Sequence, residues 1–204
     1  TANPFPSMMG RVCPAPCQDG CNRNDVEDFV GINAVEQYIG DQAISEGFSF
    51  SCTEEMSGKK VAIVGGGPAG MSAAYQLRKL GHASVIFESH DKLGGMMRFG
   101  IPSYRTPDSH LDPEINRILA MGHIDVQLNT IVGEDVSAES LEKDYDAVLW
   151  AIGCWTGRDL PVPNSDAPNC ISAIKYLEAS RQKRLQVTAK KVVCIGGGDT
   201  SIDV

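Results

Sequence analysis

The stretch that decides the fold runs from residue 60 to residue 88. It reads Lys60-Val-Ala-Ile-Val-Gly-Gly-Gly-Pro-Ala-Gly70 and, after a helical segment, Ser84-Val-Ile-Phe-Glu88. Val61–Val64 is a short apolar run, typical of a buried parallel strand. A glycine turn and a helix predicted over Ala69–Leu80 separate it from a second predicted strand, Ser84–Phe87. Strand, glycine turn, helix and strand in this order predict a βαβ unit.

The glycine turn matches the pattern G-x-G-x-x-G at Gly65, Gly67 and Gly70. In such a pattern the first glycine permits the tight turn, the second lets the backbone approach a pyrophosphate, and the third lets helix pack on strand. Glu88 ends the second strand, where an acid accepts the ribose hydroxyls of a dinucleotide. A plain glycine-rich turn without a ligand is the alternative. The complete order of elements favours a dinucleotide site.

A second glycine pair indicates which dinucleotide this is. Gly94 and Gly95 lie in the stretch Lys92–Pro102, just after the acidic strand end. They would let the backbone pass the flavin side of FAD, and Arg98 could pair with a phosphate. The alternative is a surface loop with a solvated arginine. We expect FAD at this unit rather than NAD.

A second glycine turn lies near the end of the sequence. A predicted strand, Val192–Ile195, precedes Gly196-Gly-Gly198-Asp199-Thr200-Ser201. Ser201 replaces the third glycine, which a small residue can do. The turn predicts the start of an NAD(P)-binding unit, with Gly196, Gly198, Asp199 and Thr200 as cofactor-binding candidates. The residues that would distinguish NADP from NAD are absent from the sequence.

The remaining pattern extends the alternation of strands and helices. We expect a Rossmann-like α/β fold with a doubly wound parallel sheet, preceded by a small helical iron–sulfur segment. The expected domains are residues 1–56 (the cysteine-containing segment), 57–160 (the FAD domain) and 161–204 (the start of an NAD(P) domain). Both ends suggest a fragment of a longer protein. Further predicted helices are Val35–Ile44, Leu111–Met121, Ala138–Lys143 and Ile171–Arg184, and further predicted strands are Ile124–Leu128 and Ala147–Ile152.

Composition excludes several classes of protein. The net charge of −8, from 18 basic and 26 acidic residues among 204, argues against non-specific nucleic-acid binding. No apolar run reaches the roughly 18 residues that a membrane span needs. Thr1–Pro6 lacks the features of a signal peptide. We therefore expect a cytoplasmic protein without a membrane span.

Seven cysteines, odd in number and unevenly spaced, argue against a disulfide framework. Cys13, Cys17 and Cys21 form two C-x₃-C spacings, which suit an iron–sulfur cluster or zinc. Pro14 and Pro16 predict a loop rather than a regular helix here. Three thiolates are one short of a closed site, and unligated cysteines are a further alternative. The other cysteines are expected to be buried apolar residues, and the histidines to be surface residues: Cys52, Cys154, Cys170, Cys194, His82, His90, His110 and His123.

The sequence resembles a known family. Asn3-Pro-Phe-Pro6 and Gly10-Arg-Val-Cys-Pro-Ala-Pro-Cys-Gln-Asp-Gly-Cys-Asn-Arg23 resemble the N-terminal iron–sulfur segment of the glutamate synthase small (beta) subunit. Dihydropyrimidine dehydrogenase and the large subunit of the electron-bifurcating ferredoxin:NADP oxidoreductase share that module. The resemblance continues through Val61–Gly70, Gly94–Arg105, Ala147–Gly153 and Gly196–Asp203.

The resemblance implies electron flow from NADPH to FAD, then to two [4Fe–4S] clusters, then to a larger electron-accepting subunit. It implies that Cys13 and Cys17 bind one cluster, that Cys21 binds the second, and that Glu36 is a non-cysteine ligand. A solvated helix carboxylate is the alternative for Glu36. In the family the remaining cysteine ligands lie upstream of this segment. The FAD positions that the resemblance implies are Gly65, Gly67, Pro68, Ala69, Gly70, Glu88, Gly95, Arg98, Val132 and Gly153.

The cofactors would carry the chemistry, so no general base or nucleophile is predicted. Two other functions remain open from sequence. One is a self-contained FAD/NAD(P) oxidoreductase with a structural zinc site, and the other is a non-catalytic docking subunit.

Overall fold

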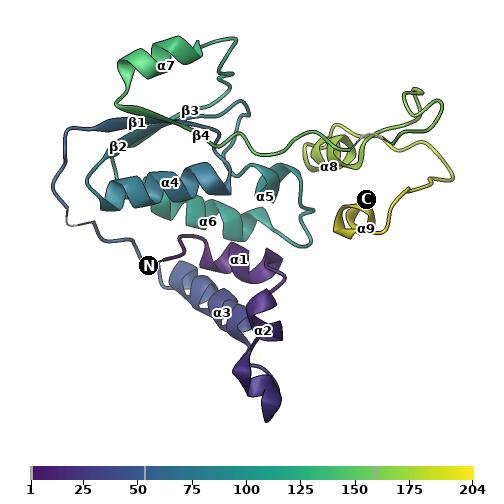
Figure 1. Ribbon diagram of the computed structural model, residues 1–204, viewed down its shortest axis with the longest axis horizontal. Helices are drawn as coiled ribbons and strands as arrows, with labels where there is room; N and C mark the ends of the chain where they lie inside the picture. The colour runs from purple at the N-terminus through teal and green to yellow at the C-terminus, as the bar shows by residue number, and fades with distance from the viewer. Residues whose placement is uncertain (1, 53, 159) are drawn as a thin grey trace.

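The computed structural model describes residues 2–52, 54–158 and 160–204, and a parallel four-stranded sheet lies at its centre (Figure 1). Its strands are β1 (Lys60–Val64), β2 (Ala83–Phe87), β3 (Ile124–Gln127) and β4 (Ala147–Trp150), in the order β3-β2-β1-β4. All three neighbouring pairs are parallel, and Ile63 lies opposite Ile86 on one side and Leu149 on the other. The predicted parallel α/β fold is confirmed.

Helices cover both faces of the sheet. On one face lie α4 (Pro68–Lys79), α6 (Asp108–Leu119) and the short α5 (Met96–Phe99), and on the other lies α7 (Ala138–Asp144) (Figure 1). Successive strand residues point to opposite faces. Accordingly Ile63 and Ile86 enter the larger core beneath α4 and α6, whereas Val64 and Val85 enter the smaller core with Leu141 of α7.

The N-terminal segment packs on the outside of α6. It contains α1 (Pro6–Val12), α2 (Pro16–Asp19), a 3₁₀ helix η1 (Asn22–Asp25) and α3 (Ile32–Ser45). Phe5 and Met8 join the larger core, while the part around η1 projects as a narrow arm (Figure 1). Within residues 2–52, no regular helix runs through the three cysteines, as predicted, but the single helical turn α2 was not predicted. Pro16 is the first residue of α2, where its fixed φ and missing N–H are tolerated.

The C-terminal segment extends away from the sheet and carries α8 (Ala173–Arg181) and α9 (Asp199–Asp203) (Figure 1). The predicted strand Val192–Ile195 is wrong, because these residues have no regular structure and Val193 is 85% exposed. A parallel strand needs a neighbour for its backbone hydrogen bonds, and no described strand pairs with this stretch.

Burial of the scattered cysteines was also predicted incorrectly. Cys154, Cys170 and Cys194 are exposed. Cys52 alone of these four is partly buried, and its thiol donates to the Arg78 carbonyl at 3.0 Å.

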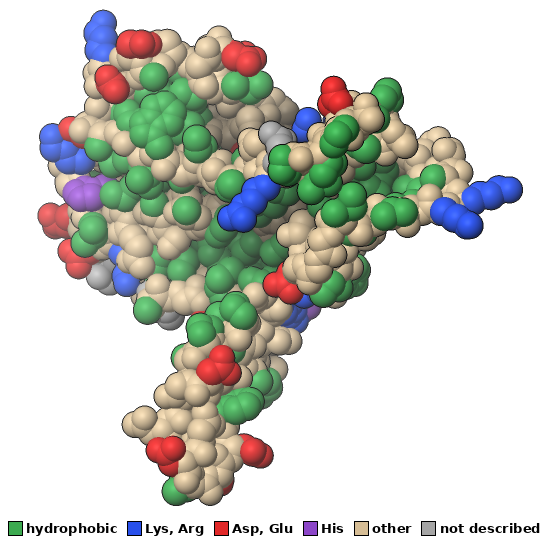
Figure 2. Space-filling model, turned by 45° about the vertical axis from the view of Figure 1, so that its right-hand side comes forward, with side chains coloured by type: hydrophobic (Ala, Val, Ile, Leu, Met, Phe, Trp, Pro, Cys, Tyr) green, Lys and Arg blue, Asp and Glu red, His purple; other side chains and the backbone are tan. Residues whose placement is uncertain are grey.

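The surface carries apolar side chains on both the sheet part and the C-terminal segment (Figure 2). They include Leu149, Trp150 and Ile152 at and just after the edge strand β4. Within the described ranges, no helix is both long and apolar enough to cross a lipid bilayer.

Candidate functional site

The first glycine turn joins β1 to α4 directly beneath the end of β2. The Gly65 N–H donates to the Phe87 carbonyl at 2.8 Å, which fixes the turn against the neighbouring strand. Gly67 is the N-cap of α4, and no side chain in the described chain caps that helix end. Its free N–H groups and the positive end of the helix dipole suit a pyrophosphate. A Cβ on Gly70 would lie 2.0 Å from the Gly65 carbonyl oxygen, so only glycine allows this packing.

The second glycine pair lies against the first turn. The Gly94 N–H donates to the Gly66 carbonyl at 2.9 Å. A Cβ on Gly95 would lie 2.7 Å from the Gly67 Cα, and Gly95 has a φ of +51°. Two loops that are separate in sequence therefore form one backbone cradle with little room for side chains.

Glu88 closes this cradle at the end of β2. Its side chain is almost fully buried, and its Oε2 accepts the Gly66 N–H at 2.7 Å. Its Oε1 accepts the His90 backbone N–H at 2.9 Å and lies 2.9 Å from the His90 Nδ1. The structure thus places the predicted acid on the glycine turn. An acceptor for ribose hydroxyls fits this position, and that role stays a prediction.

His90 was expected at the surface, and this is wrong. Its side chain is 19% exposed, and its ring stacks against Phe99 and against Trp155, with centroid distances of 4.3 Å and 4.9 Å. The interplanar angles are 23° and 28°. Its position two residues after the strand-ending acid was the one sequence signal that could have revealed it.

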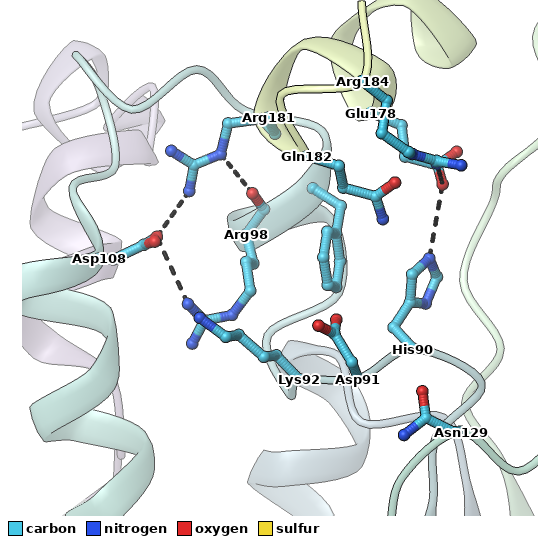
Figure 3. A pocket seen from close by; sticks show the side chains of 11 residues that line it. His90, Asp91, Lys92, Arg98, Asp108, Asn129, Glu178, Arg181, Gln182 and Arg184 are labelled. Atoms are coloured by element: carbon cyan, nitrogen blue, oxygen red, sulfur yellow. Dashed lines mark hydrogen bonds and ion pairs between the residues drawn. The ribbon is translucent and has the colours of Figure 1, made fainter.

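The Arg98 side chain binds α6 and the loop before α5. Its Nε donates to the Leu93 carbonyl at 2.5 Å, and its guanidinium forms ion pairs with Asp108 and Asp112 of α6. Arg181 of α8 donates to the Arg98 carbonyl and binds Asp108 at 2.7 Å (Figure 3). Arg98 thus joins α5, α6 and α8, and its contact with a phosphate stays a prediction.

A cavity of about 560 Å³ lies between the loop after β2 and α8. Charged side chains of both signs line it, as Figure 3 shows. The lining includes His90, Asp91, Lys92, Glu178, Arg181 and Arg184. The turn residues are not among those that line it, so this cavity is distinct from the backbone cradle.

The other predicted cofactor residues are spread over the surface of the sheet part and the C-terminal segment. Val132 is half-buried and forms an isolated bridge with Val136. Gly153, exposed with a φ of +72°, follows β4. Pro68 and Ala69 are the first two residues of α4. The second turn is exposed and places Gly198 as the N-cap of α9, whose first residues are Asp199 and Thr200; Gly196 precedes them.

The three clustered cysteines are free thiols on the projecting arm. Cys13 and Cys17 are exposed, and Cys21 is partly buried. Hydrogen bonds from the backbone of Val30 and Arg23 lower the pKa of the Cys21 thiol, which favours the thiolate that binds metals.

Glu36 lies on α3, where its Oε1 accepts from the Asn3 Nδ2 at 2.6 Å. The described residues bring no three His, Cys, Asp or Glu side chains together as a metal site. The thiolates have the right chemistry for iron–sulfur ligands. The ligand roles of Cys13, Cys17, Cys21 and Glu36 therefore stay predictions.

A polar network that the sequence did not reveal fixes the N-terminal segment to α6. The two carboxylate oxygens of buried Glu114 accept the N–H groups of Ser7 and Met8 at 2.7 and 3.0 Å. Burial raises the pKa of Glu114 to about 7, against the opposing effect of these two hydrogen bonds. The Arg11 guanidinium binds both oxygens of Asp41 at 2.8 Å and holds the pKa of that carboxyl at about 2.

Comparison with known proteins places this geometry in a family. Residues 59–204 match the pyridine nucleotide-disulphide oxidoreductase family. The chain belongs to this family. Residues 1–48 match a second family, the 4Fe-4S cluster domain II of dihydropyrimidine dehydrogenase. The cofactors of these families are FAD, NAD(P) and a [4Fe–4S] cluster, as predicted.

Several curated relatives are similar over nearly the whole chain. The NADPH glutamate synthase small chain of Mycobacterium tuberculosis is 37% identical over 98% of this chain and 44% of its own length. The NADH glutamate synthase of Schizosaccharomyces pombe is 40% identical over 98% of this chain and 10% of its own length. The chain thus spans less than half the length of these relatives.

A solved oxidoreductase structure shares the fold of the sheet part. Mycobacterium tuberculosis FprA in complex with NADPH has a TM-score of 0.56 and 27% identity, over 59% of this chain and 28% of that chain. The match supports the Rossmann-like FAD domain and the enzyme class, an NAD(P)-dependent oxidoreductase of this family.

Proposed function

We propose that the chain is part of a cytoplasmic oxidoreductase that passes electrons from NADPH, or NADH, through FAD and [4Fe–4S] clusters to a larger partner subunit. The glutamate synthase small chains among its relatives support this reading. The observation that carries it is the contact between the Glu88 carboxylate and the Gly66 N–H at 2.7 Å. It brings the ribose-binding acid and the pyrophosphate-binding turn of a dinucleotide site together.

In this proposal the cradle binds the ADP half of FAD. The turn residues Gly65–Gly70 and the facing pair Gly94 and Gly95 would hold the pyrophosphate on the N-terminus of α4. Val132 and Gly153 would offer backbone contacts. Gly196, Gly198, Asp199 and Thr200 would begin the nicotinamide site. FAD supplies the ability to accept a hydride and release single electrons.

The cysteine arm would receive those electrons. Cys13 and Cys17 would bind one cluster, Cys21 a second, and Glu36 would be a non-cysteine ligand. The exposed position of Cys13 and Cys17 supports contact with further ligands or with the partner. We also propose that a larger partner subunit accepts the electrons from the clusters.

Replacing the acid tests the FAD site. We expect Glu88→Gln to weaken FAD binding by about tenfold, because hydrogen bonds to a charged acceptor are worth about 1.5–3 kcal/mol. FAD affinity is measured by the quenching of flavin fluorescence. The matched control is Glu139→Gln in the exposed first turn of α7. Equal FAD affinity in all three proteins would contradict the proposed site.

Anaerobic reduction tests the electron path. NADPH added to the complete protein is expected to bleach the flavin absorbance, and iron and acid-labile sulfide are expected in the purified sample. Cys17→Ser should lower the iron content, whereas Cys170→Ser, at an exposed position on the C-terminal segment, should leave it unchanged. Zinc without iron or sulfide, or a flavin that NADPH does not bleach, would contradict the proposal.

A further inference from the structure

We propose that His90 is a positioning residue that orients the Glu88 carboxylate for FAD and links it to α8, so that FAD affinity depends on the protonation of His90. The inference rests on the proposed FAD site. It concerns a residue with no part in the motif, and it follows from the contacts of the imidazole on three sides.

The two carboxylate oxygens of Glu88 have different hydrogen-bond partners. Oε1 lies within 2.9 Å of both the backbone N and the Nδ1 of His90, and the Ser89 Oγ lies 3.2 Å away. Oε2 accepts one hydrogen bond within the described residues, from the Gly66 N–H. A carboxylate offers about four acceptor sites in all. His90 therefore saturates Oε1 and leaves acceptor capacity on Oε2, the oxygen that lies on the glycine turn.

The imidazole ring of His90 cannot turn freely. It packs against Phe99, which is buried, and against Trp155, which follows β4. Contact with two aromatic rings that also lie 6.3 Å from each other restricts the rotation of the imidazole. The hydrogen bond to Glu88 then fixes which edge faces the carboxylate. A ring locked in this way holds its acceptor in one orientation before the cofactor binds, which lowers the entropic cost of binding.

The other edge of the His90 ring faces a carboxylate of α8. The His90 Nε2 lies 3.7 Å from the Glu178 Oε1 of α8 (Figure 3). A protonated imidazole donates from both nitrogens and can bridge the two carboxylates. A neutral ring that donates from Nδ1 to Glu88 turns a lone pair toward Glu178. Deprotonation thus removes the attraction to α8.

Other charges near the ring have mixed signs. Arg184 binds Glu178 at 3.2 Å and competes for that carboxylate. The remaining charged groups around the same cavity are Asp91 and Lys92 on the loop, Arg98 on α5, Asp108 on α6 and Arg181 on α8. Arg98, Asp108 and Arg181 pair among themselves. Glu88 and Glu178 are the carboxylates within 4 Å of the imidazole nitrogens in the described chain.

The test is the affinity of the flavin-free chain for FAD between about pH 5.5 and 8, the range in which histidine changes charge. In the natural chain we expect the affinity for FAD to fall several-fold as pH rises, because the neutral ring loses the attraction to Glu178 that helps to hold it against Glu88. His90→Asn keeps a donor near Nδ1 but does not titrate, so its affinity should not vary with pH. His90→Phe keeps the stacking but removes the donor, and it should bind FAD about tenfold more weakly throughout. His123→Asn is the control, because His123 is exposed and has a φ of +57°, which asparagine tolerates.

A second readout does not depend on FAD. In a Trp150→Phe background, the Trp155 fluorescence should rise with pH, because a protonated imidazole quenches a stacked indole more than a neutral one does. The same rise should be absent in His90→Asn. This measurement keeps the test decisive if His90→Phe does not fold.

The outcomes separate the two proposals. If Glu88→Gln binds FAD as the natural chain does, the FAD site itself is wrong. If Glu88→Gln weakens binding while His90→Asn keeps the pH dependence of the natural chain, the site stands and the role of His90 is wrong. The inference requires two results together. The FAD affinity of His90→Asn must not vary with pH, and the FAD affinity of His90→Phe must be lower than that of the natural chain.

Discussion

Glu114 is the buried ionisable residue whose surroundings oppose one another most clearly. Its side chain is fully buried on α6, which disfavours the charged form, while two N–H groups of the N-terminal segment favour it. Burial is the larger effect, and the pKa lies at about 7 rather than at its ordinary value of 4.5. The folded state therefore holds a proton that the unfolded state has already released above pH 4.5.

This predicts that the natural chain loses stability as pH rises from about 4.5 to 7. A rise of the Glu114 pKa from 4.5 to about 7 corresponds to at most about 3.4 kcal/mol. Asp41, with its pKa lowered to about 2, loses its stabilising effect only as pH falls below about 4. Urea unfolding at a series of pH values measures the difference. In Glu114→Gln the decrease between pH 5 and 7.5 should disappear.

Glu139→Gln, on the exposed face of α7, should keep the decrease. A Glu114→Gln variant with the same pH dependence as the natural chain would show that another group titrates.

Some of the residues at the site could be assigned from the sequence, and others could not. Gly65, Gly70 and Glu88 could be assigned because a motif fixes their spacing along the chain, and the structure places them as expected. His90 and Glu114 could not, because their partners come from elements that are distant in sequence. The ion pairs of Arg98 with Asp108 and Asp112 could not be predicted either, because the two aspartates belong to the separate helix α6.

Among the elements, α1 and α3 make the closest helix contact. A Cβ on Gly40 of α3 would lie 2.2 Å from the Ser7 backbone nitrogen of α1. In isolation, Gly to Ala inside a helix stabilises by about 0.5–1 kcal/mol. Here the added methyl group meets backbone, and overpacking costs about 1–3 kcal/mol. The clash should win.

We therefore expect Gly40→Ala to lower the free energy of unfolding by about 1–2 kcal/mol. Gly20→Ala is the control, because a Cβ on Gly20 meets nothing within 4 Å and its φ is −92°. Its effect should stay within about 0.5 kcal/mol. Thermal or urea unfolding measures both. Equal stability of the two variants would mean that α1 and α3 are not packed as described.

Elements were predictable where one face is buried locally. β1 and β2 are apolar runs with neighbours on both sides, and both were predicted within a residue of their bounds. Val192–Ile195 has the same composition but no neighbouring strand in the described structure, and it is exposed. Composition indicates a preference for strand, and a pairing partner decides whether the strand forms.

At the scale of the molecule, the account requires that the chain recognises the ADP half of FAD. FAD at one hundred times its dissociation constant should stabilise the fold by about 2.7 kcal/mol. For a chain of this length that corresponds to a rise in Tm of roughly 5–10 °C. FMN lacks the ADP half, so it should give little rise. Differential scanning fluorimetry compares the two, and an equal rise with FMN would contradict recognition through the glycine turn.

The three parts of the molecule are joined by polar contacts, in addition to the apolar contacts of Phe5 and Met8 with the larger core. Glu114 of α6 binds the Ser7 N–H of α1, and Asp41 of α3 lies 3.1 Å from the His110 Nδ1 of α6, which joins the N-terminal segment to the sheet part. Arg105 binds Asp203 at 2.7 Å and Arg181 binds Asp108 at 2.7 Å, which joins the C-terminal segment to the same part. This arrangement places the proposed FAD domain between the proposed sources and acceptors of electrons. The domain limits 1–56, 57–160 and 161–204 stay predictions.

An experimental structure of the chain soaked with FAD tests the central claim most directly. The account predicts the pyrophosphate at the N-terminus of α4, between Gly65–Gly70 and Gly94–Gly95, with the ribose hydroxyls on the Glu88 carboxylate. Flavin density in the cavity between His90 and α8 instead, with the glycine turn free, would contradict it.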